Sequence, residues 1–372
     1  MRADVARFDR YMLSQLLALF GFFSLVLVAI YWINTAVGLF EDLISDGQSA
    51  LVFLEFSLLS LPNVIRLVLP ISAFVATVYV VNRLMAESEL VVMQATGFSA
   101  FRLARPAALF GVIVAVMMLI LMNLLVPMSR TILADRTAEV RDSLASQFVK
   151  DGEFLHPVDG VTLFIREISP NGEMRGMFLQ DDRGADQVIY TAERAFLVRN
   201  ETGPKLIMVD GLAQTLEAGR LAVTRFGDFT YDLGAMLEPA TRAARRMNEL
   251  STRELLWPTE ATMTETRSDR AEMIFEGHDR LGQPLLGLAA SLIGFAALLL
   301  GAFSRFGLWR QIMGAVLLLI VLQLINTLAG AQGPRLAFGW MLAYAAPLTG
   351  CVMAVLMLWW AQRPRRQGRA RA

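Results

Sequence analysis

The sequence is poor in the residues that most enzymes use for chemistry. Its one cysteine, Cys351, excludes disulfides and cysteine-based zinc sites. Its two histidines, His156 and His278, lack a second ligand at metal-binding spacing, which argues against metal catalysis. Neither lysine, Lys150 or Lys205, stands in a phosphate-binding loop, so nucleotide hydrolysis by that route is excluded. We therefore predict no catalytic residue, no metal site and no cofactor in this chain.

Net charge is absent as well, while hydrophobic residues are abundant. The 34 basic residues balance 34 acidic ones, so no basic field remains to attract nucleic acid. Hydrophobic residues make up 55% of the chain and the mean hydropathy is +0.49, too apolar for an ordinary soluble protein. The first apolar run is too long for a cleavable signal peptide. These features predict an integral membrane protein.

Six long apolar runs predict six membrane-spanning helices. The second run has about thirty residues, or about 45 Å of helix against about 30 Å of hydrocarbon. Pro62 and Pro70 are its natural break points, which predicts an interfacial half over 51–61 and a spanning half over 65–81. The runs are 12–40, 51–81, 106–126, 284–302, 312–328 and 336–360.

Arginine clusters orient these spans. They lie at 2–10, at 305–310 and along 363–371. Because basic residues concentrate on the cytoplasmic side, both termini are expected inside. The segment between the third and fourth spans is then outside.

That segment changes character, because charges return and the apolar runs shorten to strand-like pieces. Turn signals at 170–172 and 181–184 separate some of them. The pieces are 147–149, 152–155, 161–165, 176–179, 187–190, 195–198, 205–209 and 220–231. They predict one external all-β domain, either a sandwich, a jelly roll or an open roll, followed by a helical return linker over 248–258.

The fold class is thus an α-helical integral membrane protein of three plus three spans with an inserted β domain. The predicted domains are 1–130 with the first three spans, 131–262 with the β domain, and 263–372 with the last three spans and a basic tail.

A short polar segment, residues 82–97, interrupts the apolar runs on the predicted cytoplasmic side. Its composition predicts a short helix over about 84–97, with Gly97 after its end and Ser99 capping the next helix. Apolar side chains beside two carboxylates at an aqueous loop usually meet a partner, although an ordinary solvated connection is the simpler interpretation. The candidate docking residues are Glu87, Ser88, Glu89, Leu90, Met93, Gln94 and Gly97.

Polar residues inside the spans are a second set of candidates. They would be costly against lipid, so they either bind a substrate or join helices by hydrogen bonds. For the amides the second interpretation is favoured, whereas Arg66 is the better candidate for an anionic headgroup. The candidate substrate-binding residues are Asn34, Arg66, Gln323 and Asn326.

The order Arg83-Leu84, Glu87-Ser88-Glu89-Leu90-Val91-Val92-Met93 and Ala95-Thr96-Gly97 resembles the coupling helix of the lipopolysaccharide-export permeases, the LptF/LptG (YjgP/YjgQ) family. Leu61-Pro62, Leu69-Pro70, the external β domain and His278-x-Arg280-Leu281 before Pro284 extend the likeness over nearly the whole chain. The segment 82–89 is more similar to the LptF type than to the LptG type.

The resemblance implies a non-enzymatic transport subunit of the Gram-negative inner membrane, active in outer membrane biogenesis. It also implies that the inserted domain over 131–262 is a periplasmic all-β jelly roll. It implies extraction of lipopolysaccharide and its transfer to a β-jelly-roll bridge in the periplasm. Glu89, with Glu87, would pair with a basic group of an ABC transporter ATPase, and Leu90 and Met93 would pack in its groove. The implied partners are a paralogous six-span permease (LptG type), a dimeric ATPase that binds the ATP (LptB type), a single-span jelly-roll protein (LptC type), a periplasmic bridge (LptA type) and lipopolysaccharide.

One departure bears on substrate binding, because no lysine or arginine occurs between Tyr11 and Asp42, where such permeases often carry one. The phosphate-binding residues therefore stay unassigned, apart from Arg66. Three other functions remain open. They are an ABC-linked permease for another envelope lipid, an inner-membrane adaptor that moves no substrate, and an intramembrane enzyme, for which no catalytic cluster is found.

Overall fold

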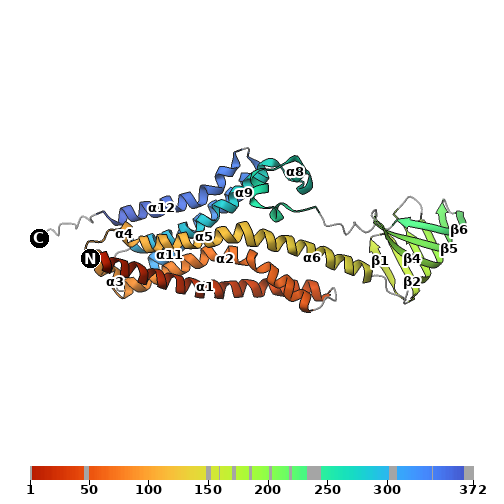
Figure 1. The fold of residues 1–372 in the computed structure, drawn as a ribbon, viewed down its shortest axis with the longest axis horizontal. Coiled ribbons are helices and arrows are strands. Elements are labelled where there is room, and N and C mark those ends of the chain that lie inside the picture. The colour runs from red at the N-terminus through yellow and green to blue at the C-terminus, as the bar shows by residue number, and fades with distance from the viewer. Residues whose placement is uncertain are drawn as a thin grey trace. The chain divides into compact units, whose positions relative to one another are not determined.

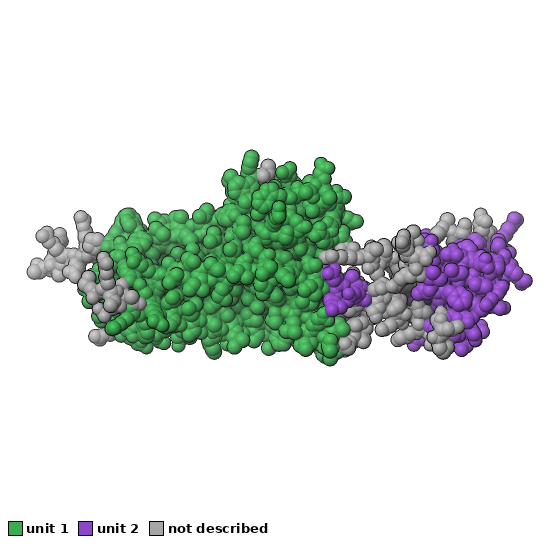
Figure 2. Space-filling model, in the orientation of Figure 1, with its two compact units in different colours: residues 1–133, 244–372 green, residues 134–243 purple. Residues whose placement is uncertain are grey.

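The computed structural model describes residues 2–45, 50–147, 152–158, 160–169, 173–183, 187–200, 203–217, 220–232, 244–300, 308–336 and 338–363. The chain forms two compact units (Figure 2). The helical unit is Met1–Leu133 with Ala244–Ala372, and the β unit is Ala134–Ala243. The expected turn at 170–172, Arg305 and the basic tail from 364 onward lie outside the described residues.

Long apolar helices make up most of the helical unit (Figure 1). Within the described residues, five are long and apolar enough to cross a membrane, or up to six if α9 and α10, bent by 43°, form one broken span. The elements are α1 (Arg2–Ser45), α2 (Ala50–Ala86), α5 (Arg105–Ile120), the π-helix η1 (Leu121–Leu125), α6 (Val126–Gln147), α9 (Arg270–Gly282), α10 (Pro284–Leu299), α11 (Trp309–Gln332), the 3₁₀ turns η3 (Gly333–Arg335) and η4 (Gly339–Tyr344), and α12 (Ala345–Ala361).

The second span runs unbroken through both of its prolines, so the expected break points are wrong, while the interfacial half over 51–61 and the spanning half over 65–81 stay a prediction. α2 is one helix of 37 residues with Pro62 and Pro70 inside it. Neighbouring helices can compensate the backbone groups that a proline frees in an apolar environment. The Trp32 indole of α1 donates a hydrogen bond of 2.8 Å to the Ser57 hydroxyl, a side-chain contact that joins α1 to α2 in the part of the helix before Pro62.

Helix α10 occupies the centre of the helical unit. It packs against α2, α5, α11 and α12, and most of its side chains are buried. Small residues permit this close approach. A Cβ on Gly111 of α5 would stand 2.4 Å from the Ser291 hydroxyl oxygen, so any larger residue there would push the two helices apart.

A group of short helices, the helical cap (residues 245–282), lies at the other end of the helical unit from α3 and α4 (Figure 1). Its core is formed by Leu250, Leu255 and Met273. Capping boxes begin α7 at Ser251 and α8 at Thr259. The cap contains η2 (Met247–Glu249), α7 (Thr252–Leu256), α8 (Glu260–Thr266) and α9.

The β unit contains one six-stranded antiparallel sheet in the order β1-β2-β3-β4-β5-β6. The predicted pieces 187–190 and 195–198 are parts of one long strand, β4. The two ends of the piece 220–231 likewise belong to a single strand, β6. Of the piece 147–149, Gln147 ends α6 and the rest lies outside the described residues. The strands are β1 (Phe154–Val158), β2 (Val161–Ile168), β3 (Met174–Asp181), β4 (Gln187–Asn200), β5 (Gly203–Glu217) and β6 (Arg220–Asp232).

Each described strand pairs with its neighbour in sequence, for example Leu163 with Leu179 and Ile207 with Thr230. A jelly roll contains Greek-key connections between non-consecutive strands, and the described strands form none. Alternate side chains meet on one face, where Ile165, Leu179 and Met208 are fully buried. The β domain is therefore a meander with its own apolar core.

A polar network joins β3 to β6. The Arg183 side chain donates to Asp181 Oδ1 at 2.9 Å, and the Tyr231 hydroxyl donates to Asp181 Oδ2 at 2.6 Å. The bonds from Arg183, strengthened by the one from Tyr231, hold the pKa of Asp181 well below its usual range, although partial burial opposes the shift. A carboxyl with a lowered folded-state pKa stabilises the fold above its unfolded pKa of about 4, and this contribution is lost as the pH falls.

We expect Asp181→Asn to destabilise the sheet by about 1 kcal/mol near neutral pH, because the charged acceptor is lost from a partly exposed network. The difference from the unchanged protein should begin to shrink below about pH 4, where the unfolded chain takes up the proton first, and should vanish only when the pH falls through the lowered folded-state pKa of Asp181. This difference in stability is measured by urea unfolding of the full chain, with amide hydrogen exchange in β3 and β6 as the probe of the sheet. A difference that grows as the pH falls would contradict this assignment.

Candidate functional site

The connecting segment (residues 87–104) joins α2 to α5 and contains two short helices. α2 continues through Ala86, and Ser88 then adopts a left-handed conformation with φ of 62°. This residue ends the first helix, since left-handed backbone cannot continue it. The expected helix over about 84–97 is therefore narrowed to α3 (Glu89–Ala95), with 84–86 belonging to α2.

The end of α3 follows the sequence expectation closely. Gly97 has φ of +91° and its N–H donates to the Gln94 carbonyl at 3.0 Å. The Ser99 hydroxyl accepts a hydrogen bond from the Arg102 N–H at 3.2 Å, and α4 (Ala100–Leu103) begins there. These local signals fix where α3 stops and the chain turns back toward α5.

The side chains of α3 divide between the core and the surface. Leu90 is fully buried in the core of the helical unit, so its expected role in contacting a partner is wrong. It faces inward because α3 lies against its own bundle, and one side of so short a helix must be covered. Val92 is 58% exposed, and Gln94 is exposed too.

A groove beside α3, the acidic groove, has a volume of about 360 Å³. It holds four of the seven predicted docking residues together, whereas Leu90, Gln94 and Gly97 do not line it. Phe8 of α1 reaches it from a distant part of the chain and could not be predicted from the local sequence. The lining residues are Phe8, Glu87, Ser88, Glu89, Val92 and Met93.

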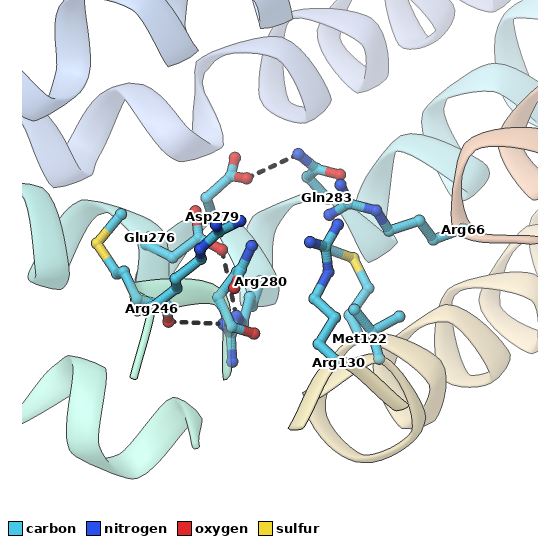
Figure 3. A pocket seen from close by; sticks show the side chains of 11 residues that line it. Arg66, Met122, Arg130, Arg246, Glu276, Asp279, Arg280 and Gln283 are labelled. Atoms are coloured by element: carbon cyan, nitrogen blue, oxygen red, sulfur yellow. Dashed lines mark hydrogen bonds and ion pairs between the residues drawn. The ribbon is translucent and has the colours of Figure 1, made fainter. Parts of the chain in front are cut away.

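A second hollow, the arginine cavity, lies where α2, η1 and α6 meet η2 and α9 of the helical cap (Figure 3). Its volume is about 400 Å³, within the range of small-molecule sites. Four arginines and two carboxylates line it, so positive charge is in excess. The lining residues are Arg66, Met122, Val126, Arg130, Arg246, Met247, Asn248, Glu276, Asp279, Arg280 and Gln283.

Arg280 is the one arginine of the cavity that is buried, at 3% exposure. Its guanidinium donates to the backbone carbonyls of Leu250 at 2.7 Å, Asn248 at 3.3 Å and Met247 at 3.4 Å, and pairs with Glu276 at 3.3 Å. Its charge and donors are therefore used to hold the chain at η2 against α9. We assign it a structural role in closing the cavity wall.

Arg66 and Arg130 extend from α2 and α6 into the same space (Figure 3). Arg130 donates one hydrogen bond of 2.7 Å, to the neutral amide oxygen of Asn63. The buried Nε of Arg66 has no hydrogen-bond partner among the residues that the structure describes. Two guanidinium groups facing one cavity repel each other unless an anion lies between them. This geometry suits a phosphate or carboxylate, which accepts bonds from both.

The structure does not bring the four predicted substrate-binding residues together. Asn34 is exposed on α1, while Gln323 is exposed and Asn326 half-buried on α11. Arg66 alone lines the arginine cavity. Sequence reasoning missed Arg130 and Arg246, although an arginine just past the third apolar run was visible as a signal.

Asn123, a polar residue inside the third span, joins two parts of the helical unit. Its side-chain Oδ1 accepts a hydrogen bond from the Thr252 hydroxyl of the helical cap. It lies in the π-helix η1, next to Met122 of the cavity wall. Its polar group thus serves interhelical packing beside the cavity.

Comparison with known proteins shows which family this chain is similar to. Residues 10–363 match the family described as lipopolysaccharide export system permease LptF/LptG. An uncharacterized protein of Rickettsia prowazekii (strain Madrid E) is 23% identical over 304 residues, which cover 80% of this chain and 83% of that protein. The lipopolysaccharide export system permease protein LptF of Escherichia coli (strain K12) is 22% identical over 200 residues, 53% of each chain, and that of Shigella flexneri matches equally. With a family match over nearly its whole length, this chain belongs to the LptF/LptG family of lipopolysaccharide export system permeases.

Proposed function

We propose that this chain is the LptF-type subunit of a transporter that extracts lipopolysaccharide from the inner membrane. Membership of the permease family over residues 10–363 is the observation that carries this proposal. The similarity to curated LptF proteins supports the subunit type. The expected partners are an LptG-type permease, an ATPase that supplies ATP hydrolysis, and LptC-type and LptA-type jelly-roll proteins.

In this proposal the connecting segment faces the cytoplasm, both termini lie on that side, and the β unit is periplasmic. The acidic groove then receives the ATPase. Glu87 and Glu89 offer negative charge to a basic partner, while Val92 and Met93 offer apolar contact. Such a combination of a charge that sets orientation and an apolar anchor is typical of the small set of residues that dominate an interface.

The arginine cavity is lined in part by the helical cap, which lies at the other end of the helical unit from α3 (Figure 1). Lipopolysaccharide is a phosphorylated lipid, so we assign its phosphate groups to Arg66 and Arg130. Since the apolar part of the first span contains no basic residue, we assign phosphate binding to the arginines of α2 and α6 instead. A β meander with an apolar face would receive the lipid on its way to the bridge.

Purification in mild detergent, with mass spectrometry of co-purifying proteins, tests the assembly directly. We expect a P-loop ATPase and a second six-span permease. Arrival of the protein alone, or with periplasmic proteins only, would favour the adaptor function instead.

Glu89→Ala is expected to weaken association with the ATPase about tenfold or more, because one partner of an interfacial charge pair is removed. The fold should be unaffected, since an exposed or half-buried surface carboxylate contributes little to stability. Binding of the ATPase to the variant measures the association, and ATP-driven lipid release from proteoliposomes measures the resulting loss of transport. Glu260→Ala is the matched control, because Glu260 is exposed on the helical cap, far from the acidic groove. Equal transport by the Glu89→Ala variant and the control would refute docking at α3.

A further inference from the structure

The N-terminal end of α1 is fastened to the connecting segment by a two-point ion pair. Arg102 Nη1 and Nη2 donate to Asp9 Oδ1 at 3.0 Å and to Oδ2 at 2.7 Å. The two side chains are only 19% and 33% exposed. A guanidinium and a carboxylate joined by two parallel bonds are fixed in angle as well as in distance. The contact therefore orients one segment against the other across 93 residues of chain.

A second polar contact joins α1 to the end of α2. Arg83, at the end of α2, donates to the side-chain oxygen of Gln15 on α1. The same arginine approaches Glu87 of the acidic groove, with 3.7 Å between Nε and Oε1. Arg83 thus links α1 to the first residue of the connecting segment.

Apolar packing reinforces the two polar contacts. Met12, Leu16 and Phe20 on one face of α1 are at most 5% exposed. They belong to the same core as Leu90 of α3 and Leu103 of α4. The N-terminal end of α1 lies beside α3 (Figure 1), and Phe8, one residue before Asp9, lines the acidic groove.

We propose that Asp9 and Arg102 are positioning residues that join α1 to the connecting segment as one rigid body. This inference rests on the proposed function, in which the acidic groove docks an ATPase. The groove itself stays formed by its carboxylates and α3, so the pair acts on transmission and not on docking. A displacement of α3 by the partner then reaches the first span directly, in addition to α2 and α5.

The test uses the full complex in proteoliposomes, with ATPase binding and ATP-driven lipid release measured separately. Asp9→Asn and Arg102→Gln should each lower lipid release about tenfold, as expected when one charge of a partly buried bidentate pair is lost. ATPase binding should stay within about twofold, because the carboxylates of the groove remain. The exchanged pair Asp9→Arg with Arg102→Asp should recover most of the release.

Glu139→Gln is the matched control, because it removes a surface ion pair with Arg136 whose side chains are 48% and 64% exposed. Its release should equal that of the unchanged protein. Normal release by both single variants, or an exchanged pair no better than either, would overturn the proposal. Glu89→Ala, measured in parallel, separates the two ideas. If it too leaves binding and release unchanged, the docking function itself fails.

A distance measurement gives a readout that a merely structural role would not move. Spin labels are placed at Ser14→Cys on α1 and Thr96→Cys after α3, both exposed, in a Cys351→Ala background. In a rigid body the distance between the labels stays the same with and without bound nucleotide. In the Asp9→Asn variant it should change on nucleotide binding. A change in the protein with Asp9 intact would overturn the proposal.

Discussion

Arg280→Leu is expected to lower the free energy of unfolding of the helical unit by about 3–5 kcal/mol, the largest stability effect we predict. The guanidinium is buried and bonds to the carbonyls of Leu250, Asn248 and Met247. Leucine leaves these acceptors without a donor and Glu276 without its cation. Each unsatisfied buried group adds its own desolvation cost. The η2 and α7 part of the helical cap should loosen from α9 before the apolar spans separate.

Hydrogen exchange of the segment 245–256 in detergent measures this loosening, with thermal unfolding of the full chain beside it. Arg280→Lys should recover only part of the stability, because a lysine keeps the charge but cannot reproduce the planar set of donors. Arg270→Leu is the control, since Arg270 begins the same helix and is exposed. Equal exchange in the Arg280→Leu and Arg270→Leu variants would show that the carbonyls find other partners.

Local signals in the sequence predicted the elements of this fold better than their arrangement. Gly97 and Ser99 determine the end of α3 and the start of α4 through their own backbone and hydroxyl groups, so both were visible in the sequence. Length and composition likewise predicted the long apolar helices, of which the described residues contain five, or up to six if α9 and α10 form one span. The predicted helix breaks at Pro62 and Pro70 are absent, because the surroundings of a proline in the folded structure decide whether a helix breaks there.

The burial of individual side chains and the contacts between distant residues could not be predicted from the sequence. Leu90 follows two carboxylates in a segment that the sequence predicts to be exposed, yet its side chain is completely buried in the core of the helical unit. The arginine cavity combines residues from 66, 122–130, 246–248 and 276–283, which no local pattern relates. Asp9 and Arg102 are likewise ordinary surface charges until the fold places them 2.7 Å apart. Sequence reasoning found Arg66 because a charge beside an apolar run is costly by itself.

Reversal of both charges in Arg66→Glu with Arg130→Glu is expected to reduce binding of phosphorylated lipid by about a hundredfold or more. A hydrogen bond to a charged group contributes about 1.5–3 kcal/mol, and a factor of ten in binding is about 1.4 kcal/mol. The variant loses two such donors, and two added carboxylates repel the phosphate. Single Arg66→Gln or Arg130→Gln changes should cost about tenfold each, since one guanidinium remains.

Equilibrium binding of lipopolysaccharide to the purified complex, with ATP-driven release in proteoliposomes, measures these losses. Three comparisons decide the assignment. Arg253→Glu reverses an exposed charge outside the cavity and should bind lipid normally. Asn34→Ala and Gln323→Ala should also have little effect, because these amides lie away from the cavity. Lipid stripped of its phosphates should bind the unchanged protein and the Arg66→Gln variant with the same weak affinity. If Arg66→Gln weakens that lipid as strongly as the phosphorylated one, the guanidinium contacts some other part of the lipid, and the phosphate site must be sought on the partner permease.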